Sequence, residues 1–162
     1  MATYSVSPSG ERFELPGAEE NGRELKRLEG LVAQARSEGK EIVVVMGVGF
    51  VGAVMAAIIA DSVGGDGEPG KFVIGCQRPS VRSYWKIPLL ARGESPVKAE
   101  DPDVAPMIRR VVLEKKTLAA THNSECLRLG VASSWTSSAT TRNATWAGCT
   151  RAPPRCPRSR RR

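Results

Sequence analysis

The sequence predicts an α/β domain in which a parallel β-sheet is flanked by helices. Two short apolar runs, residues 41–46 and 71–76, lack polar alternation, as is typical of parallel strands that are buried on both faces. Between them, residues 51–62 are rich in small and helix-forming side chains. Strand, helix and strand in this order form a βαβ unit, whose two strands lie parallel. This unit is the main reason for the predicted fold class.

The composition is that of a globular chain with one domain. The chain has 162 residues, of which 41% are hydrophobic and 25% charged, and this length suffices for a single core. Its net charge of +7 comes from residues 131–162, which hold seven arginines and no acid, whereas basic and acidic residues balance in residues 1–130. A basic tail attracts phosphate backbones whatever their sequence. We therefore expect no specific nucleic-acid partner.

The N-terminal residues predict a cytoplasmic protein. Residues 1–17 lack a basic stretch followed by an apolar run, so no signal peptide is apparent. We expect the cysteines to be reduced thiols for this reason. Their spacing matches no zinc pattern, and no metal site is predicted. The cysteines concerned are Cys76, Cys126, Cys149 and Cys156.

The first 40 residues are expected to form an extended arm and one packing helix. The arm covers residues 1–17, which are mixed and polar with several prolines and glycines. In residues 18–39, leucines and other apolar residues recur at three- and four-residue spacing, which predicts an amphipathic helix. Gly39 is a natural end for that helix.

Three glycines after the first predicted strand have the G-x-G-x-x-G spacing of a phosphate-binding turn. Gly47 permits the tight turn, Gly49 leaves room for a pyrophosphate beside the main chain, and Gly52 lets the helix pack closely on the strand. The helix N-terminus near Phe50 and Val51 presents free amides to the diphosphate. The pattern predicts a Rossmann-like dinucleotide-binding fold.

The same stretch allows a second interpretation. Residues Ile42–Ala60 are long and apolar enough to cross a membrane. The β-branched residues come before the glycines and the better helix formers after them, which favours strand, turn and helix. A small membrane protein and a non-enzymatic nucleotide-binding module are kept as alternatives; we expect no membrane partner.

The remainder of the chain predicts an incomplete Rossmann-like domain over residues 41–129 and a disordered basic tail over 130–162. The tail has no apolar period that would build a further strand or helix. His122, which has no second ligand or nucleophile beside it, is expected to be a polar turn residue. The other elements are expected as a loop at 63–70, a short helix within 79–91, a helix that begins at the capping Asp101 and ends at Lys116, a strand at 117–121 and a helix over 122–129.

Four segments in residues 42–129 resemble the N-terminal domain of nucleotide-sugar dehydrogenases, the UDP-glucose/GDP-mannose dehydrogenase family. These segments are VVVMGVGFVGAVMA, FVIGCQRPS, KIPLLARGESPVKAEDPDV and KKTLAATHNSECLRL. The resemblance implies an NAD-dependent oxidoreductase that oxidises the C6 hydroxyl of a UDP- or GDP-sugar to a carboxylate through a cysteine thioester.

The resemblance also implies which residues bind the cofactor. The diphosphate would lie against the glycine turn, Gly47, Val48, Gly49, Phe50, Val51 and Gly52. The second strand should end in an acid that binds the adenosine ribose, but Gln77 and Arg78 stand there. Gln77 suits a ribose hydroxyl, whereas Arg78 suits a 2′-phosphate or is a solvated surface cation, which keeps NADP open beside NAD. Arg82 lies where the family often carries a basic residue that faces the cofactor.

Members of this family continue into a second domain with the catalytic Lys and Cys. The chain shows no counterpart of it, so we predict no catalytic residue, an inactive chain, and a nucleotide-sugar partner only if that domain is supplied. Codons for Ala132–Ser137, read two bases on, can encode Val-Val-Val-Asp-Val, the strand that the family pattern requires there. We hypothesise a shifted reading frame from about residue 130. An incomplete sheet has an unprotected edge, so self-association through this edge is expected.

Overall fold

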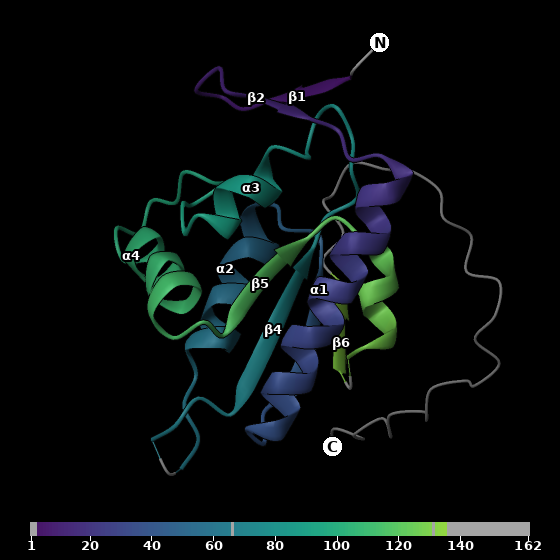
Figure 1. Ribbon diagram of the computed structural model, residues 1–162. Coiled ribbons are helices and arrows are strands. Elements are labelled where there is room, and N and C mark those ends of the chain that lie inside the picture. The colour runs from purple at the N-terminus through teal and green to yellow at the C-terminus, as the bar shows by residue number, and fades with distance from the viewer. Residues whose placement is uncertain (1–2, 66, 131, 136–162) are drawn as a thin grey trace, which may run out of the picture.

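A four-stranded parallel sheet forms the centre of the molecule (Figure 1). The computed structural model describes residues 3–65, 67–130 and 132–135. The strand order is β5-β4-β3-β6, and the strands are β3 (Glu41–Met46), β4 (Lys71–Cys76), β5 (Leu118–Thr121) and β6 (Ala132–Trp135). The predicted α/β fold with a parallel, Rossmann-like sheet is confirmed. The strands at 41–46 and 71–76 have the predicted bounds.

The apolar run in β3 is explained by helices on both faces of the sheet. Val43 and Val45 pack into one hydrophobic cluster, and Ile42 and Val44 pack into a second cluster on the opposite face. This alternation follows from the two-residue period of a strand. A sheet covered on both faces needs apolar side chains at every position of its central strands.

One face of the sheet is covered by α1 (Ala18–Ser37) together with the 3-10 helix η2 (Ser124–Arg128). Leu28 and Val32 of α1 are nearly fully buried there. The amphipathic helix predicted for residues 18–39 is confirmed, and Gly39 follows its end with a φ of +76°. Figure 1 shows α1 to the right of β5 and β4.

The other face is covered by the helix that follows the glycine turn and by three shorter segments. The helix after the glycine turn buries Ala56, Ala57 and Ala60, and these small side chains let it lie close to the sheet. These elements are α2 (Phe50–Asp61), α3 (Lys86–Ala91), α4 (Val104–Arg109) and the π-helical turn η1 (Arg110–Glu114).

The extended arm predicted for residues 1–17 is instead an antiparallel hairpin. Its strands are β1 (Tyr4–Val6) and β2 (Arg12–Glu14), and Ser5 pairs with Phe13 in its centre. Gly10 has a φ of +89° in the turn between them, which suits a residue without a Cβ.

Two predicted helices differ from the structure. The helix expected from Asp101 begins at Val104, because the Asp101 carboxylate accepts the Asp103 N–H at 2.9 Å in a local turn instead of capping the helix. The helix expected over 122–129 is the short η2, where the Asn123 side chain accepts the Glu125 N–H at 2.9 Å.

The prediction that no strand follows residue 130 is wrong for residues 132–135. They form β6, which pairs with β3 in parallel register from Val43–Ala132 to Met46–Trp135. The free edge of β3 offers backbone donors and acceptors to any extended segment, so a strand forms there without an apolar run. The rest of the predicted tail, residues 136–162, lies outside the described residues, and the shifted reading frame stays a hypothesis.

The membrane-spanning alternative is wrong for the described part of the chain. The stretch Ile42–Ala60 is divided into β3, the glycine turn and α2. No helix within the described residues is both long and apolar enough to cross a bilayer.

Candidate functional site

The candidate site is the edge of the sheet where β3, β4 and β5 have their carboxyl ends. In open α/β sheets, ligands bind outside these ends. Backbone hydrogen bonds join the three ends, since the Gly47 N–H donates to Cys76 O at 2.7 Å and the Gln77 N–H donates to Thr121 O at 2.9 Å. The glycine turn and the residues after β4 and β5 therefore form one continuous surface.

The glycine turn has the backbone conformation that the sequence predicts. Gly47 has a φ of +89°, in the left-handed region that disfavours residues with a Cβ. Gly49 is the N-cap of α2, with φ −79° and ψ −160°, and a Cβ added there would meet nothing within 4 Å. Open space therefore lies beside the main chain at Gly49. Gly52 is buried in the first turn of α2.

The N-terminus of α2 faces this open space, and few side chains there would compete with a ligand for its free amides. Phe50 and Val51 are both 58% exposed, and the first turn carries no acidic side chain. The first amides of a helix have no acceptor within the helix and carry partial positive charge. The arrangement can hold an anion such as a diphosphate.

The side chain of Val48, in the glycine turn, packs against Gly75 of β4. This contact was not predicted from the sequence. The Val48 side chain is fully buried, and a Cβ added to Gly75 would lie 2.8 Å from Val48 Cγ1. Gly75, the last residue but one of β4, thus makes room for the turn residue. A glycine inside a buried strand was the available signal, because it often marks a close approach.

The segment after β4 carries Gln77 and Arg78, which are predicted to lie at the adenosine ribose, and Arg82, which is predicted to face the cofactor. The Gln77 Nε2 donates to Ser83 Oγ at 3.3 Å, and the Ser83 hydroxyl lies 3.3 Å from Arg78 O, to which it donates. Arg82 O accepts the Trp85 Nε1–H at 3.0 Å. The segment is therefore folded back on itself by hydrogen bonds. Its Arg78 borders the pocket described next, whereas Gln77 and Arg82 are not among the residues that line it.

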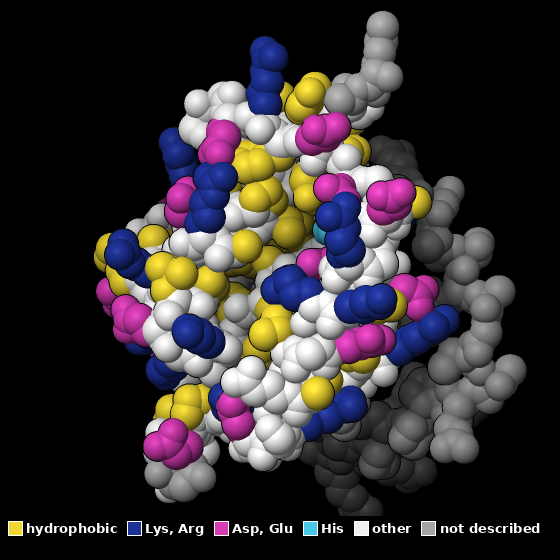
Figure 2. Space-filling model, in the orientation of Figure 1, with side chains coloured by type: hydrophobic (Ala, Val, Ile, Leu, Met, Phe, Trp, Pro, Cys, Tyr) yellow, Lys and Arg dark blue, Asp and Glu magenta, His cyan; other side chains and the backbone are white. Residues whose placement is uncertain are grey.

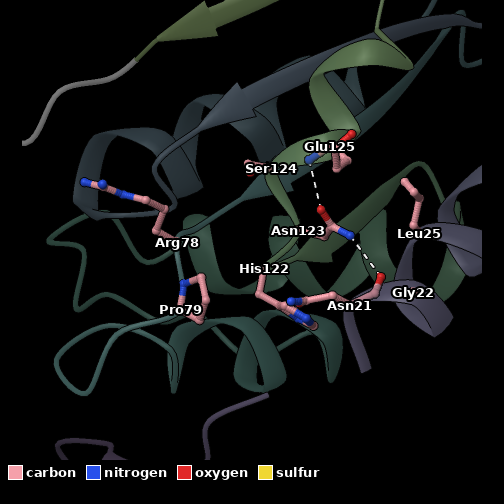
Figure 3. Close-up of a pocket in the computed structure, with 9 residues that line it drawn as sticks. All are labelled: Asn21, Gly22, Leu25, Arg78, Pro79, His122, Asn123, Ser124 and Glu125. Carbon is pink, nitrogen blue, oxygen red and sulfur yellow. Dashed lines mark hydrogen bonds between the residues drawn. The ribbon is translucent and has the colours of Figure 1, made fainter. Parts of the chain in front are cut away.

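A pocket of about 650 Å³ lies between this segment, η2 and the start of α1. Figure 3 shows Arg78 and Pro79 on one side, Asn21 and Leu25 on the other, and the residues after β5 between them. Asn123 joins the middle of this wall to the α1 side, because its Nδ2 donates to Asn21 O at 2.9 Å. The lining residues are Asn21, Gly22, Leu25, Arg78, Pro79, His122, Asn123, Ser124 and Glu125. The pocket thus borders Arg78, one of the two residues predicted to lie at the adenosine ribose.

His122, expected as a polar turn residue, is buried at the end of β5. It is 8% exposed, its ring contacts Tyr84 edge-on at 5.8 Å between centroids, and its Nε2 has no hydrogen-bond partner among the described residues. Burial lowers the pKa of His122, and nearby Glu24 only partly opposes this. The imidazole is therefore neutral near pH 7.

The two described cysteines are buried free thiols behind the site. Cys76 ends β4 and Cys126 lies in η2, both with no exposed surface, and the Cys76 thiol donates to Asn123 O at 3.7 Å. Their mutual hydrogen bond raises the pKa of Cys126 and lowers the pKa of Cys76. Neither thiol is open to a substrate. Within residues 3–65, 67–130 and 132–135, no three His, Cys, Asp or Glu side chains are placed to hold a metal ion.

Comparison with known proteins finds related folds among sugar-nucleotide enzymes. No family model and no curated protein matches the chain. An NDP-N-acetyl-D-galactosaminuronic acid dehydrogenase from Methanosarcina mazei Go1 matches 67% of the chain with 31% identity and a TM-score of 0.53. A UDP-glucose dehydrogenase from Pyrobaculum islandicum matches 59% with 20% identity and a TM-score of 0.47.

The chain spans about a fifth of these proteins, 21% and 19% of their lengths. The first match combines sequence identity with the fold, and it agrees with the resemblance drawn from the motifs. The chain is thus similar, over this part, to nucleotide-sugar dehydrogenases.

Proposed function

We propose that the domain binds a nicotinamide dinucleotide, NAD before NADP, as part of a nucleotide-sugar dehydrogenase. The observation that carries the proposal is the glycine turn, where Gly47 has a positive φ and a Cβ at Gly49 would meet only open space. A diphosphate needs both the sharp turn and this close approach to the main chain. The amides of Phe50 and Val51 would hold its oxygens at the N-terminus of α2.

The described residues are suited to cofactor binding and offer no centre for chemistry. Held by the glycine turn and the N-terminus of α2, a bound nicotinamide dinucleotide would supply the hydride acceptor for oxidation of the sugar hydroxyl. Oxidation at C6 to a carboxylate further needs an accessible nucleophile, whereas Cys76 and Cys126 are both fully buried. We therefore propose that a second domain of the kind found in this family must be supplied to provide the catalytic groups. We expect no turnover of UDP- or GDP-sugars by this chain alone.

Calorimetric titration of the full chain with NAD, NADP and ADP tests this function. We expect saturable binding of the dinucleotide at one site. ADP should bind at the same site, and prior saturation with NAD should block its binding. A chain that is folded by circular dichroism but shows no saturable heat with any of the three would refute the proposal. Production of reduced nicotinamide from NAD and UDP-glucose, followed by absorbance, would show instead that the chain has its own catalytic groups.

A further inference from the structure

The N-terminal hairpin is fastened to the segment that follows β4. The Ser5 hydroxyl donates to Val81 O at 2.8 Å and accepts the Trp85 N–H at 3.2 Å. Ser5 itself has no exposed surface. Figure 1 shows the hairpin β1–β2 next to the loop between β4 and α3. One buried hydroxyl thus bonds two backbone groups that lie about 80 residues away in the sequence.

A second contact joins the hairpin to the far end of the same segment. Arg92, just after α3, forms an ion pair with Glu11 at 2.8 Å and lies over the Phe13 ring, with Cζ 5.6 Å from the centroid. The hairpin therefore bridges the start and the end of residues 81–92. A surface ion pair alone contributes little, so the buried Ser5 contact is the stronger of the two.

The Ser5 contact lies at one end of a hydrogen-bonded network that reaches the predicted adenosine residues. Trp85, whose backbone Ser5 holds, donates through its indole N–H to Arg82 O. Ser83, between these two positions, is bonded to Gln77 Nε2 and to Arg78 O. The residues that Ser5 holds, Val81 and Trp85, are therefore linked through Ser83 to the Gln77 side chain and to the Arg78 carbonyl.

We propose that the hairpin is a clamp that positions residues 77–85 for the adenosine half of the dinucleotide, with Ser5 as its positioning residue. The inference rests on the proposed function, because residues just after the second strand of this fold face the adenosine ribose. Without the Ser5 hydroxyl, a carbonyl and an amide in a part-buried contact lose their partners, which favours a different loop conformation. The diphosphate turn lies on another loop and does not depend on this contact.

Ser5→Ala in the full chain tests the clamp, with Ser9→Ala as the matched control. Ser9 lies in the same hairpin, but its hydroxyl bonds to Ser7 Oγ at 2.8 Å. Each variant is titrated with ADP, which carries the adenosine, and with inorganic pyrophosphate, which carries only the diphosphate. For Ser5→Ala we expect ADP affinity to fall about five- to tenfold, the equivalent of one or two hydrogen bonds, and pyrophosphate affinity to stay within about twofold. Ser9→Ala should match the wild type with both ligands.

Each other result has a definite meaning. Unchanged ADP affinity in Ser5→Ala, or an equal loss for ADP and pyrophosphate, overturns the clamp while the proposed function stands. Absence of binding by the wild-type chain removes the proposed function, and the clamp with it. If Ser5→Ala does not fold, Arg92→Gln takes its place, since Arg92 is half exposed and touches the hairpin from the other end. A selective loss of ADP affinity of about threefold is then expected, and a wild-type profile contradicts the clamp.

Discussion

Gly49→Ala separates cofactor binding from stability more sharply than any other change at the site. The folded chain tolerates the extra methyl group, because a Cβ at Gly49 meets nothing within 4 Å and its φ of −79° suits alanine. The only cost is the poorer N-cap of α2, about 0.5–1 kcal/mol of the free energy of unfolding. The same methyl group would occupy the space that a diphosphate must enter.

The expected effect on binding is much larger than the effect on stability. Loss of one charge-assisted hydrogen bond from an amide to a phosphate oxygen costs about 1.5–3 kcal/mol, which weakens the dinucleotide affinity by roughly 10- to 150-fold. Gly30→Ala on α1 is the matched control, since a Cβ there also meets nothing within 4 Å and the residue lies outside the site.

Urea denaturation and calorimetric titration of the same preparations measure both quantities. Gly30→Ala should bind NAD as the wild type does, whereas Gly49→Ala should unfold at nearly the wild-type urea concentration and bind at least tenfold more weakly. Wild-type affinity in Gly49→Ala would show that no ligand approaches the main chain at this residue, and the assignment of the diphosphate site would be wrong.

Three further changes test the packing, the electrostatics and the cofactor preference. Gly75→Ala should lower the free energy of unfolding by about 1–3 kcal/mol, because its Cβ would lie 2.8 Å from Val48 Cγ1; urea denaturation measures this, and partial recovery in Gly75→Ala/Val48→Ala would identify the clash. The Asp61 carboxylate accepts two hydrogen bonds from Arg110 and lies 2.9 Å from Lys115 Nζ. These two cations, Arg110 above all, lower the pKa of Asp61 from 3.8 to about 2. A carboxylate whose pKa is lowered by folding contributes its full stabilisation to the folded state at pH values above its unfolded pKa. Asp61→Asn should therefore lower the free energy of unfolding by about 1 kcal/mol at pH 7. That difference should vanish as the pH falls from about 4 to 2, and a penalty that is independent of pH would rule out the ion pairs as its cause. Arg78→Ala should lower the NADP affinity more than the NAD affinity, because only NADP carries a 2′-phosphate; equal losses in competition titrations would show that Arg78 does not contact that phosphate.

The central part of the fold was predictable because its signals are local. β3 and β4 are continuous apolar runs, and the glycines between β3 and α2 mark the turn that the structure shows at Gly47. The periodic leucines of α1 likewise identify its buried face. In each case the side chains that form the element also supply its pattern.

The elements that sequence reasoning missed depend on distant partners. The hairpin β1–β2 has strands of three residues each and is held by Ser5 against Val81 and Trp85. Strand β6 forms on the free edge of β3 through its backbone. Neither contact leaves a periodic signal in the local sequence, because a hydroxyl or a backbone amide can pair wherever the fold places it.

The backbone bonds along the carboxyl edge of the sheet have a consequence for the cost of binding. Gly47 is tied to Cys76, and Gln77 is tied to Thr121, so the loops that would meet the two halves of a dinucleotide are ordered before it arrives. A ligand that fits this edge spends little of its interaction energy on immobilising the chain, and more of that energy appears as affinity. Hydrogen exchange at these two amides should therefore already be slow without ligand and change little when one binds.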